Sequence, residues 1–187
     1  MASDIINPLG MDDRFWYIRY FQQPGVAETE LESDLGRSLL SIYYTLSADA
    51  PPAAFMKQGE HPRTSGLLDT MLTPKQMPSW LTREDLAYYV EQYRISGFRG
   101  GLNWYRNVPT NNSITPELES KRFTQPAAFL AGTADDVLLY DPNWRAKFLK
   151  AFDDLRFLEL VEGAGHWVQM EKPKETTALI LRFLQSL

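Results

Sequence analysis

Cysteine is missing from all 187 residues of this sequence. Its absence excludes disulfides, cysteine-ligated zinc and a thiolate nucleophile. Histidine is almost as scarce, because the sequence contains only His61, in a proline-rich stretch typical of a solvated loop, and His166. Without H-x-x-x-H or H-E-x-x-H spacing a catalytic metal site has little support, and the G-x-G at 163–165 is too short for a nucleotide-binding fingerprint. We therefore expect neither a metal nor a cofactor.

The sequence also lacks a long hydrophobic run and a basic stripe. No segment approaches the ~20 consecutive apolar residues that a membrane span needs, and residues 1–10 lack the basic and apolar regions of a signal peptide. The net charge is -5, so nothing suggests binding to nucleic acid. With 44% hydrophobic and 23% charged residues, the composition is that of a folded globular protein, for which the cytoplasm is the default location.

Helical patterns separated by proline-rich loops occupy the first 120 residues. One helix is predicted at 28–46, and a second at 82–97, where Thr82 and Asp85 form a T-x-x-D variant of the capping box. Residues 48–80 between them are predicted to form a lid or variable loop without strands. The residues expected to face inward are Leu31, Leu35, Leu39, Ile42 and Tyr43 in the first helix and Leu86, Tyr89, Val90 and Tyr93 in the second.

From residue 121 onward the pattern alternates between strand and helix. Strands are predicted at 127–131 and 156–161, with a crossover helix at 143–154 and a closing helix at 173–187 that begins with proline. Such parallel βαβ units are typical of α/β folds. Two parallel strands are too few for a stable sheet, so we expect this region to be part of a larger sheet.

A carboxylate and a histidine follow the two predicted strands. Asp135 follows the first strand and His166 the second, and the carboxyl ends of parallel strands are where α/β sheets bind their ligands. Acid followed by histidine is also the order of the last two members of the α/β-hydrolase triad, in which the carboxylate orients the imidazole. Asp135 occupies the aspartate position of a G-x-x-D-x-V pattern, with Asp136 as the alternative acid. Taken alone, His166 could equally be a loop histidine and Asp135 a helix cap.

Three blocks of the sequence resemble soluble epoxide hydrolases, and the resemblance covers essentially the whole chain. The blocks are Tyr20–Glu28 (YFQQPGVAE), Ser96–Asn107 (SGFRGGLNWYRN) and Gly165–Pro173 (GHWVQMEKP). The resemblance implies an incomplete α/β-hydrolase fold, with a helical cap at 1–120 followed at 121–187 by the last βαβα part of the parallel core sheet. It also implies a small-molecule epoxide substrate and chemistry without a metal or cofactor.

By the same resemblance, Tyr20 and Tyr105 would project from the cap and donate hydrogen bonds to the epoxide oxygen. A phenol with a pKa near ~10 stays protonated at neutral pH and can donate to the alkoxide that ring opening produces. An aspartate would attack the ring carbon, and water activated by His166, which Asp135 orients, would hydrolyse the ester to a vicinal diol. The other tyrosines are expected to be structural: Tyr17, Tyr43, Tyr44, Tyr88, Tyr89 and Tyr93.

The attacking aspartate is missing from this pattern. The sequence contains no H-G-x-P segment and no G-x-D-x-G or G-x-S-x-G elbow, and Asp12, Asp13 and Asp69 lie in cap-like segments. We therefore expect the chain alone to have no turnover. Two alternatives remain: a haloalkane or haloacid dehalogenase of the same fold, and a non-catalytic truncated protein that binds other chains. An incomplete sheet edge would favour self-association.

Overall fold

The computed structural model describes residues 5–187, apart from the side chain of Glu119. Residues 1–4, which form part of the stretch predicted to lack a signal peptide, lie outside the described residues. Within the described range, no helix combines the length and the apolar composition needed to cross a membrane.

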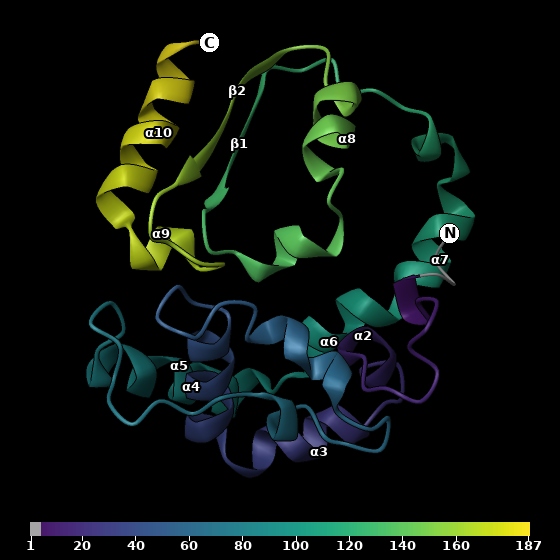
Figure 1. The fold of residues 1–187 in the computed structure, drawn as a ribbon, viewed down its shortest axis with the longest axis vertical. Helices are drawn as coiled ribbons and strands as arrows, with labels where there is room; N and C mark the ends of the chain where they lie inside the picture. The colour runs from purple at the N-terminus through teal and green to yellow at the C-terminus, as the bar shows by residue number, and fades with distance from the viewer. Residues whose placement is uncertain (1–4) are drawn as a thin grey trace. The chain divides into compact units, whose positions relative to one another are not determined.

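The described chain forms two compact units, which Figure 1 draws with the course of the chain in colour. The first unit contains the described residues up to Thr45 together with Ala54–Pro116, and the second contains Leu46–Ala53 together with Glu117–Leu187. The sequence pattern predicts one region for residues 1–120. Residues 46–53 nevertheless belong to the second unit, and this segment is too short to have a hydrophobic period that would reveal it.

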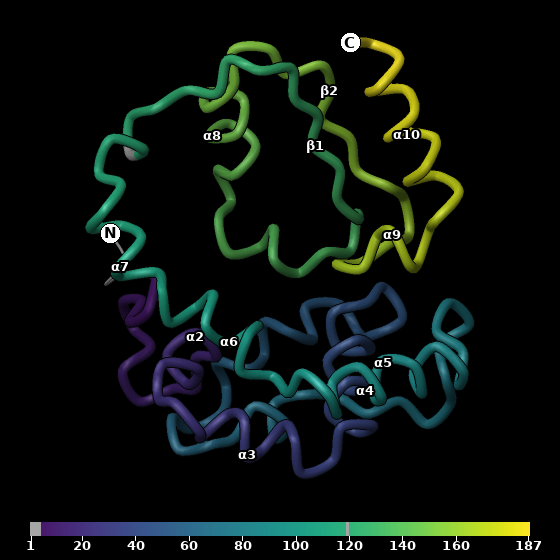
Figure 2. The backbone as a smooth tube through the Cα atoms, turned by 180° about the vertical axis from the view of Figure 1, so that it is seen from behind, coloured from purple at the N-terminus to yellow at the C-terminus, as the bar shows by residue number. Residues whose placement is uncertain are grey.

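The first unit is helical. Helices α4 and α5 pack side by side in it, as the tube in Figure 2 also shows, and the rings of Tyr43 and Tyr89 meet between them with centroids 5.4 Å apart. The α-helices of this unit are α2 (Tyr17–Tyr20), α3 (Val26–Ser33), α4 (Leu35–Thr45), α5 (Arg83–Ser96), α6 (Arg99–Arg106) and α7 (Val108–Ile114).

The single helix predicted at 28–46 is wrong, because the chain forms two helices there. Asp34 leaves the helical conformation between α3 and α4, with φ -146° and ψ 88°. Its carboxylate accepts the N–H of Arg37 at 3.0 Å, the usual way in which aspartate caps a helix N-terminus. The apolar spacing runs through this break and conceals it: Leu31 and Leu39 are buried, and Leu35, Ile42 and Tyr43 are half-buried.

The helix predicted at 82–97 is confirmed as α5. The Thr82 hydroxyl accepts the N–H of Asp85 at 3.0 Å, and the Asp85 carboxylate accepts the N–H of Thr82 at 3.0 Å. Gly97 ends the helix with φ 65°, a conformation that glycine adopts without strain. The predicted inward face is also confirmed, because the half-buried positions of α5 are Leu86, Tyr89, Val90 and Tyr93.

Residues 48–80 contain no strand, as predicted, but they are more ordered than the prediction of a variable loop suggests. Two short 3-10 helices lie there, η1 (Phe55–Glu60) and η2 (Leu68–Thr70). The side chains of Phe55 and Gln58 are buried. Helices of one or two turns are too short to produce a readable hydrophobic period.

Residues 48–80 also form backbone contacts with residues 14 and 15 near the start of the chain. The carbonyl of His61 accepts the N–H of Phe15 at 2.8 Å, and Arg14 and Pro62 form an isolated antiparallel bridge. Phe15 is completely buried. His61, predicted to be a solvated loop residue, is half-buried as a result.

The second unit is built around two parallel strands, as predicted. The strands pair in register from Ala128 opposite Phe157 to Gly132 opposite Val161. The elements of this unit are η3 (Pro116–Glu119), which joins it to the first unit, β1 (Ala127–Gly132), η4 (Asp136–Tyr140), α8 (Trp144–Ala151), β2 (Leu155–Val161), α9 (Val168–Glu171) and α10 (Pro173–Gln185).

Helices cover the two faces of this sheet, with α8 and α10 on opposite sides of the strands in Figure 1. The ring of Phe129 in β1 lies 4.5 Å from that of Phe148 in α8, and the ring of Phe157 in β2 lies 6.4 Å from that of Phe183 in α10. The alternation of side chains along a strand accounts for this division. The apolar cluster beneath the loop after β2 comprises Val161, Ala164 and Val168, with Leu130 and Leu179 packed against it.

Candidate active site

His166 and Asp135, predicted to act as an acid and base pair, lie together beyond the carboxyl ends of the two strands. The Nδ1 atom of His166 is 3.1 Å from both carboxylate oxygens of Asp135. The Asp135 side chain is 9% exposed and that of His166 is 37% exposed. This geometry holds the imidazole with its Nδ1 proton toward the carboxylate, which leaves Nε2 able to accept a proton.

The structure brings Asp135 rather than Asp136 to the histidine. Asp135 caps η4, and its Oδ1 accepts the N–H of Val137 at 2.9 Å. Asp136 is buried, and its Oδ1 accepts the N–H of Ala53 at 3.2 Å. The two neighbouring aspartates therefore accept from different backbone N–H groups, and Asp135 lies 3.1 Å from the imidazole.

The loops that carry the acid and the histidine are held to each other through their backbones. The N–H of Ala134 donates to the carbonyl of Ala164 at 2.9 Å, and the N–H of Gly163 donates to the hydroxyl of Thr133 at 3.0 Å. A Cβ atom at Gly132 would lie 2.0 Å from the carbonyl oxygen of Ala164. Only glycine permits this close approach of the two loops.

In the first unit, the tyrosine that lies against Tyr105 is Tyr17. Their rings, from α6 and α2, meet edge to face with centroids 5.7 Å apart, and both rings also contact Phe21. Burial raises the pKa of both phenols, and the neighbouring Tyr105 raises that of Tyr17 further. Among the described residues neither hydroxyl has a hydrogen-bond partner, so both can donate to a ligand at neutral and alkaline pH.

Tyr20, predicted to act with Tyr105, lies in different surroundings. Its hydroxyl donates to Glu30 at 2.8 Å, and the same carboxylate accepts the N–H groups of Leu67 and Leu68 at 2.9 and 3.0 Å. Burial and the bond to Glu30 raise the pKa of Tyr20. The structure does not bring Tyr20 to Tyr105, and its hydroxyl serves a structural hydrogen bond. The tyrosine in contact with Tyr105 is Tyr17, which the sequence prediction treated as structural.

Arg106 fixes the helix that carries Tyr105 to the turn after α2. Its Nη1 and Nη2 atoms donate to the two carboxylate oxygens of Glu28 at 2.7 and 2.9 Å, and its Nε donates to the carbonyl of Phe21 at 2.8 Å. The pair is mostly buried, with 11% of the Arg106 side chain and 13% of the Glu28 side chain exposed. The hydrogen bonds from Arg106 lower the pKa of Glu28 to about 2. The side-chain amide of Gln22 also donates to the carbonyl of Tyr105, at 3.2 Å.

Comparison with known proteins gives a family for this arrangement. No family model matches the chain, but curated relatives do. The chain is 38% identical over 175 residues to Epoxide hydrolase A of Mycobacterium tuberculosis, a match that covers 94% of this chain and 53% of that protein. It is 33% identical over 177 residues to Bifunctional epoxide hydrolase 2 of Rattus norvegicus, covering 92% of this chain and 30% of that protein.

Solved structures agree. Epoxide Hydrolase A from Mycobacterium thermoresistibile superposes with a TM-score of 0.82 at 40% identity, over 93% of this chain and 53% of that one. An epoxide hydrolase from an endophytic Streptomyces superposes with a TM-score of 0.90 at 31% identity, over 98% of this chain and 55% of that one. The chain belongs to the epoxide hydrolase family. The predicted family and α/β-hydrolase fold are confirmed, and the chain corresponds to the C-terminal part of such an enzyme.

The chain spans about half the length of the epoxide hydrolases that these structures represent. The matched half includes the loops of Asp135 and His166 and the helices of Tyr17 and Tyr105. These matches identify the family but assign no role to any side chain. The predicted roles of Asp135, His166 and Tyr105 therefore stay predictions.

An apolar cavity of about 480 Å³ borders Tyr105 within the first unit. A concave, mostly apolar surface with a few polar groups in its wall is the usual form of a site for a hydrophobic small molecule. The side chains of the wall include Phe21, Leu31, Ile42, Phe98, Leu102 and Trp104.

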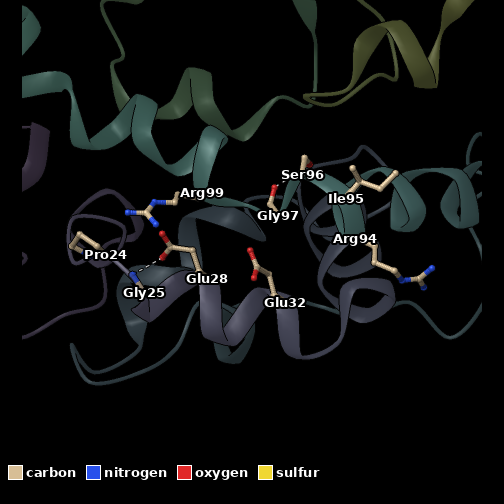
Figure 3. A pocket seen from close by; sticks show the side chains of 9 residues that line it. All are labelled: Pro24, Gly25, Glu28, Glu32, Arg94, Ile95, Ser96, Gly97 and Arg99. Carbon is tan, nitrogen blue, oxygen red and sulfur yellow. Dashed lines mark hydrogen bonds between the residues drawn. The ribbon is translucent and has the colours of Figure 1, made fainter.

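A second hollow, of about 590 Å³, lies over the start of α3 and the end of α5 (Figure 3). Figure 3 shows the carboxylates of Glu28 and Glu32 along one side of it. Both have internal partners, because Glu28 pairs with Arg106 and Glu32 accepts the N–H of Phe98 at 2.8 Å. Nowhere in residues 5–187 do three histidine, aspartate or glutamate side chains gather as metal ligands would.

Proposed function

We propose that this chain supplies the proton-transfer pair and the epoxide-oxygen donors of an epoxide hydrolase. The observation that carries the proposal is the 3.1 Å contact between His166 and Asp135, whose side chain is 9% exposed. The epoxide specificity is supported by the two adjacent phenols of Tyr17 and Tyr105, whose hydroxyls have no partner among the described residues.

In the first step, a carboxylate from the other half of the fold attacks one ring carbon of the epoxide. The C–O bond to the ring oxygen breaks, so an ester forms and negative charge develops on that oxygen. Tyr17 and Tyr105 donate to this oxygen, and one of them delivers the proton that turns it into a hydroxyl. Because burial raises the pKa of both phenols, both still carry their protons at the start of the step.

In the second step, water hydrolyses the ester. The Nε2 atom of His166 takes a proton from the water as its oxygen bonds to the ester carbonyl carbon, and Asp135 stabilises the imidazolium that results. The bond between the carbonyl carbon and the alkoxy oxygen then breaks, and that oxygen takes the proton held by His166 and leaves as the second hydroxyl. The second proton of the water is released when the new carboxylic acid ionises, and it restores the phenol that gave up its proton in the first step. The products are a vicinal diol and the regenerated carboxylate.

Two alternatives have different signatures. A dehalogenase of the same fold would form the same type of ester but would release a halide, for which donors such as Trp or Asn are better suited than a tyrosine pair. A non-catalytic binding protein would need no oriented imidazole, so the Asp135–His166 contact favours an enzyme. We also propose, as the sequence predicted, that the 187-residue chain alone has no turnover.

The test compares the chain alone with a chimera. The chimera joins the first half of Epoxide hydrolase A of Mycobacterium tuberculosis to this chain, and both proteins are assayed for diol formation from styrene oxide. We expect diol from the chimera and none from the chain alone. H166N should abolish diol formation, whereas H61N, at the other histidine, should leave it within about two-fold of the unmodified chimera.

Several outcomes would contradict these proposals. Diol formation by the chain alone would refute its inactivity. A folded chimera that releases bromide from 1-bromobutane but forms no diol would favour the dehalogenase. A folded chimera with neither activity would favour the binding protein.

A further inference from the structure

We propose that Glu171 is the positioning residue that sets the orientation of His166. This inference rests on the proposed function, because it concerns the same imidazole. Glu171 is the last residue of α9, five positions after the histidine, and its side chain is half-buried. Its carboxylate turns back toward the loop from which α9 emerges.

The carboxylate of Glu171 holds the backbone on both sides of the histidine. Its Oε2 accepts the N–H of Gly165 at 2.9 Å, and its Oε1 accepts the N–H of Trp167 at 3.1 Å. His166 thus lies between two amides that one side chain fixes. With its backbone held at these two points, the imidazole has little freedom beyond its own side-chain rotations.

A third bond extends this cluster to a distant part of the chain. The Oε2 of Glu171 also accepts the N–H of Ala48 at 2.9 Å, and the N–H of His166 itself donates to the carbonyl of Leu46 at 2.9 Å. A Cβ at Gly165 would lie 2.6 Å from the backbone nitrogen of Ala48. Residues 46–48 therefore lie directly against the histidine loop, and Glu171 is the bridge between the two backbones.

Only a carboxylate can make this set of bonds. An ionised glutamate presents acceptors on both oxygens, whereas a glutamine amide replaces one of them with an NH2 donor. In E171Q that NH2 would face at least one backbone N–H, and a donor would oppose a donor. Hydrogen bonds to a charged acceptor are stronger than those to a neutral one, so their loss should release the loop locally. The three hydrogen bonds of Glu171 all come from backbone N–H groups. We therefore place it as a residue that acts through His166 and not on the substrate.

The test is an NMR comparison of the 187-residue chain with its E171Q variant. The first readout is hydrogen exchange at the amides of Gly165, Trp167 and Ala48, which should become at least about 10-fold faster in E171Q. The second is the Nδ1–H proton resonance of His166, which reports its bond to Asp135 and should broaden or disappear. A merely structural role would not move this second signal in a variant that remains folded by circular dichroism.

The matched control is E175Q, which removes the same charge from an exposed side chain one turn further along the chain. It should leave exchange at the three amides within about two-fold of the parent chain and the His166 signal unchanged. E171D, whose carboxylate is one methylene shorter, should protect fewer of the amides and give intermediate exchange.

The positioning role is overturned if the three amides stay protected in E171Q. It is equally overturned if they lose protection while the Nδ1–H signal of His166 is unchanged. Should E171Q not fold, the parent chain still decides the matter, because exchange of the three amides at the rate of an unstructured loop would show that the carboxylate does not hold them. No readout requires turnover, so an inactive chimera would refute the proposed function without affecting this result.

Discussion

The two units differ in how completely each buries its own apolar side chains. The buried apolar residues of the first unit include large side chains from most of its helices, namely Phe15, Ile18, Phe21, Leu31, Leu39, Leu81 and Leu102. Those of the second unit are few and mostly small: Leu46, Ala131, Val161, Ala164 and Val168. The first unit contains its own core, whereas the second has the beginning of one.

The same difference is visible on the surface of α10. Ile180 and Leu184 are exposed four positions apart on α10, so they form a short apolar stripe on the helix, and exposed Leu187 follows just beyond the end of the helix. A two-stranded sheet is marginal by itself, and the chain covers only 53% of Epoxide hydrolase A of Mycobacterium tuberculosis. Tyr17 and Tyr105 therefore lie in a unit with its own apolar core, whereas Asp135 and His166 lie in a unit that leaves apolar side chains exposed.

The largest expected effect separates the tyrosines of the first unit. In the chimera, Y17F and Y105F should each lower the rate of diol formation by about 100-fold, because each removes a donor to the developing alkoxide. Y20F removes a hydroxyl bonded to Glu30, so we expect it to lower thermal stability but to change the rate by less than about three-fold. A large loss of activity in Y20F with little loss in Y17F would contradict the role that we propose for Tyr17 and would support the sequence prediction of Tyr20.

The next effect tests whether the first unit is organised by its buried ion pair. R106M leaves Glu28 without its partner and should destabilise the protein by about 3 kcal/mol in urea unfolding. Hydrogen exchange should accelerate in α3 and α6 but not in β1 and β2. The control is R94M, because Arg94 pairs with Glu91 at an exposed position and should change stability by less than about 1 kcal/mol. Equal acceleration in both units would show that they unfold together.

A smaller effect concerns acid. Arg106 holds the pKa of Glu28 at about 2, below its ordinary value of 4.5, so the folded state favours the ionised carboxylate. This stabilisation is complete above pH 4.5 and is lost as the pH falls from 4.5 to about 2. The parent chain should lose about 2 kcal/mol more than E28Q across this window in chemical unfolding. Parallel curves for the two proteins would contradict the assigned cause.

The smallest effect on stability is expected on the exposed stripe of the second unit. I180Q/L184Q should change the free energy of unfolding by less than about 0.5 kcal/mol. If these side chains contribute to the self-association that the incomplete sheet edge leads us to expect of the isolated chain, the double variant should weaken it. Sedimentation equilibrium over a range of concentrations measures this. The control L179Q replaces a side chain packed against the cluster of Val161 and should cost about 2 kcal/mol. Unchanged association in I180Q/L184Q would exclude this stripe as the contact.

The sequence predicted the second unit better than the first for physical reasons. Strand periods, a proline at a helix start and the position of His166 after a strand are local signals, and they correctly anticipated its contact with Asp135. Helix spacing could not separate Tyr17 from Tyr20, because residues three apart share a helix face, and the contact of Tyr17 with Tyr105 joins segments distant in the sequence. No local signal could show Glu171 reaching Ala48, because that bond joins residues 123 positions apart.

The most direct test of the central claim is the covalent state of the chimera after mixing with styrene oxide. If Asp135 and His166 act after ester formation and Tyr17 and Tyr105 act before it, H166N should accumulate protein heavier by one epoxide molecule, detected by intact mass spectrometry. Y17F/Y105F should accumulate none, because its ring opening is slow while its hydrolysis is intact. Both variants without adduct, or both with it, would contradict this division of the reaction between the two units.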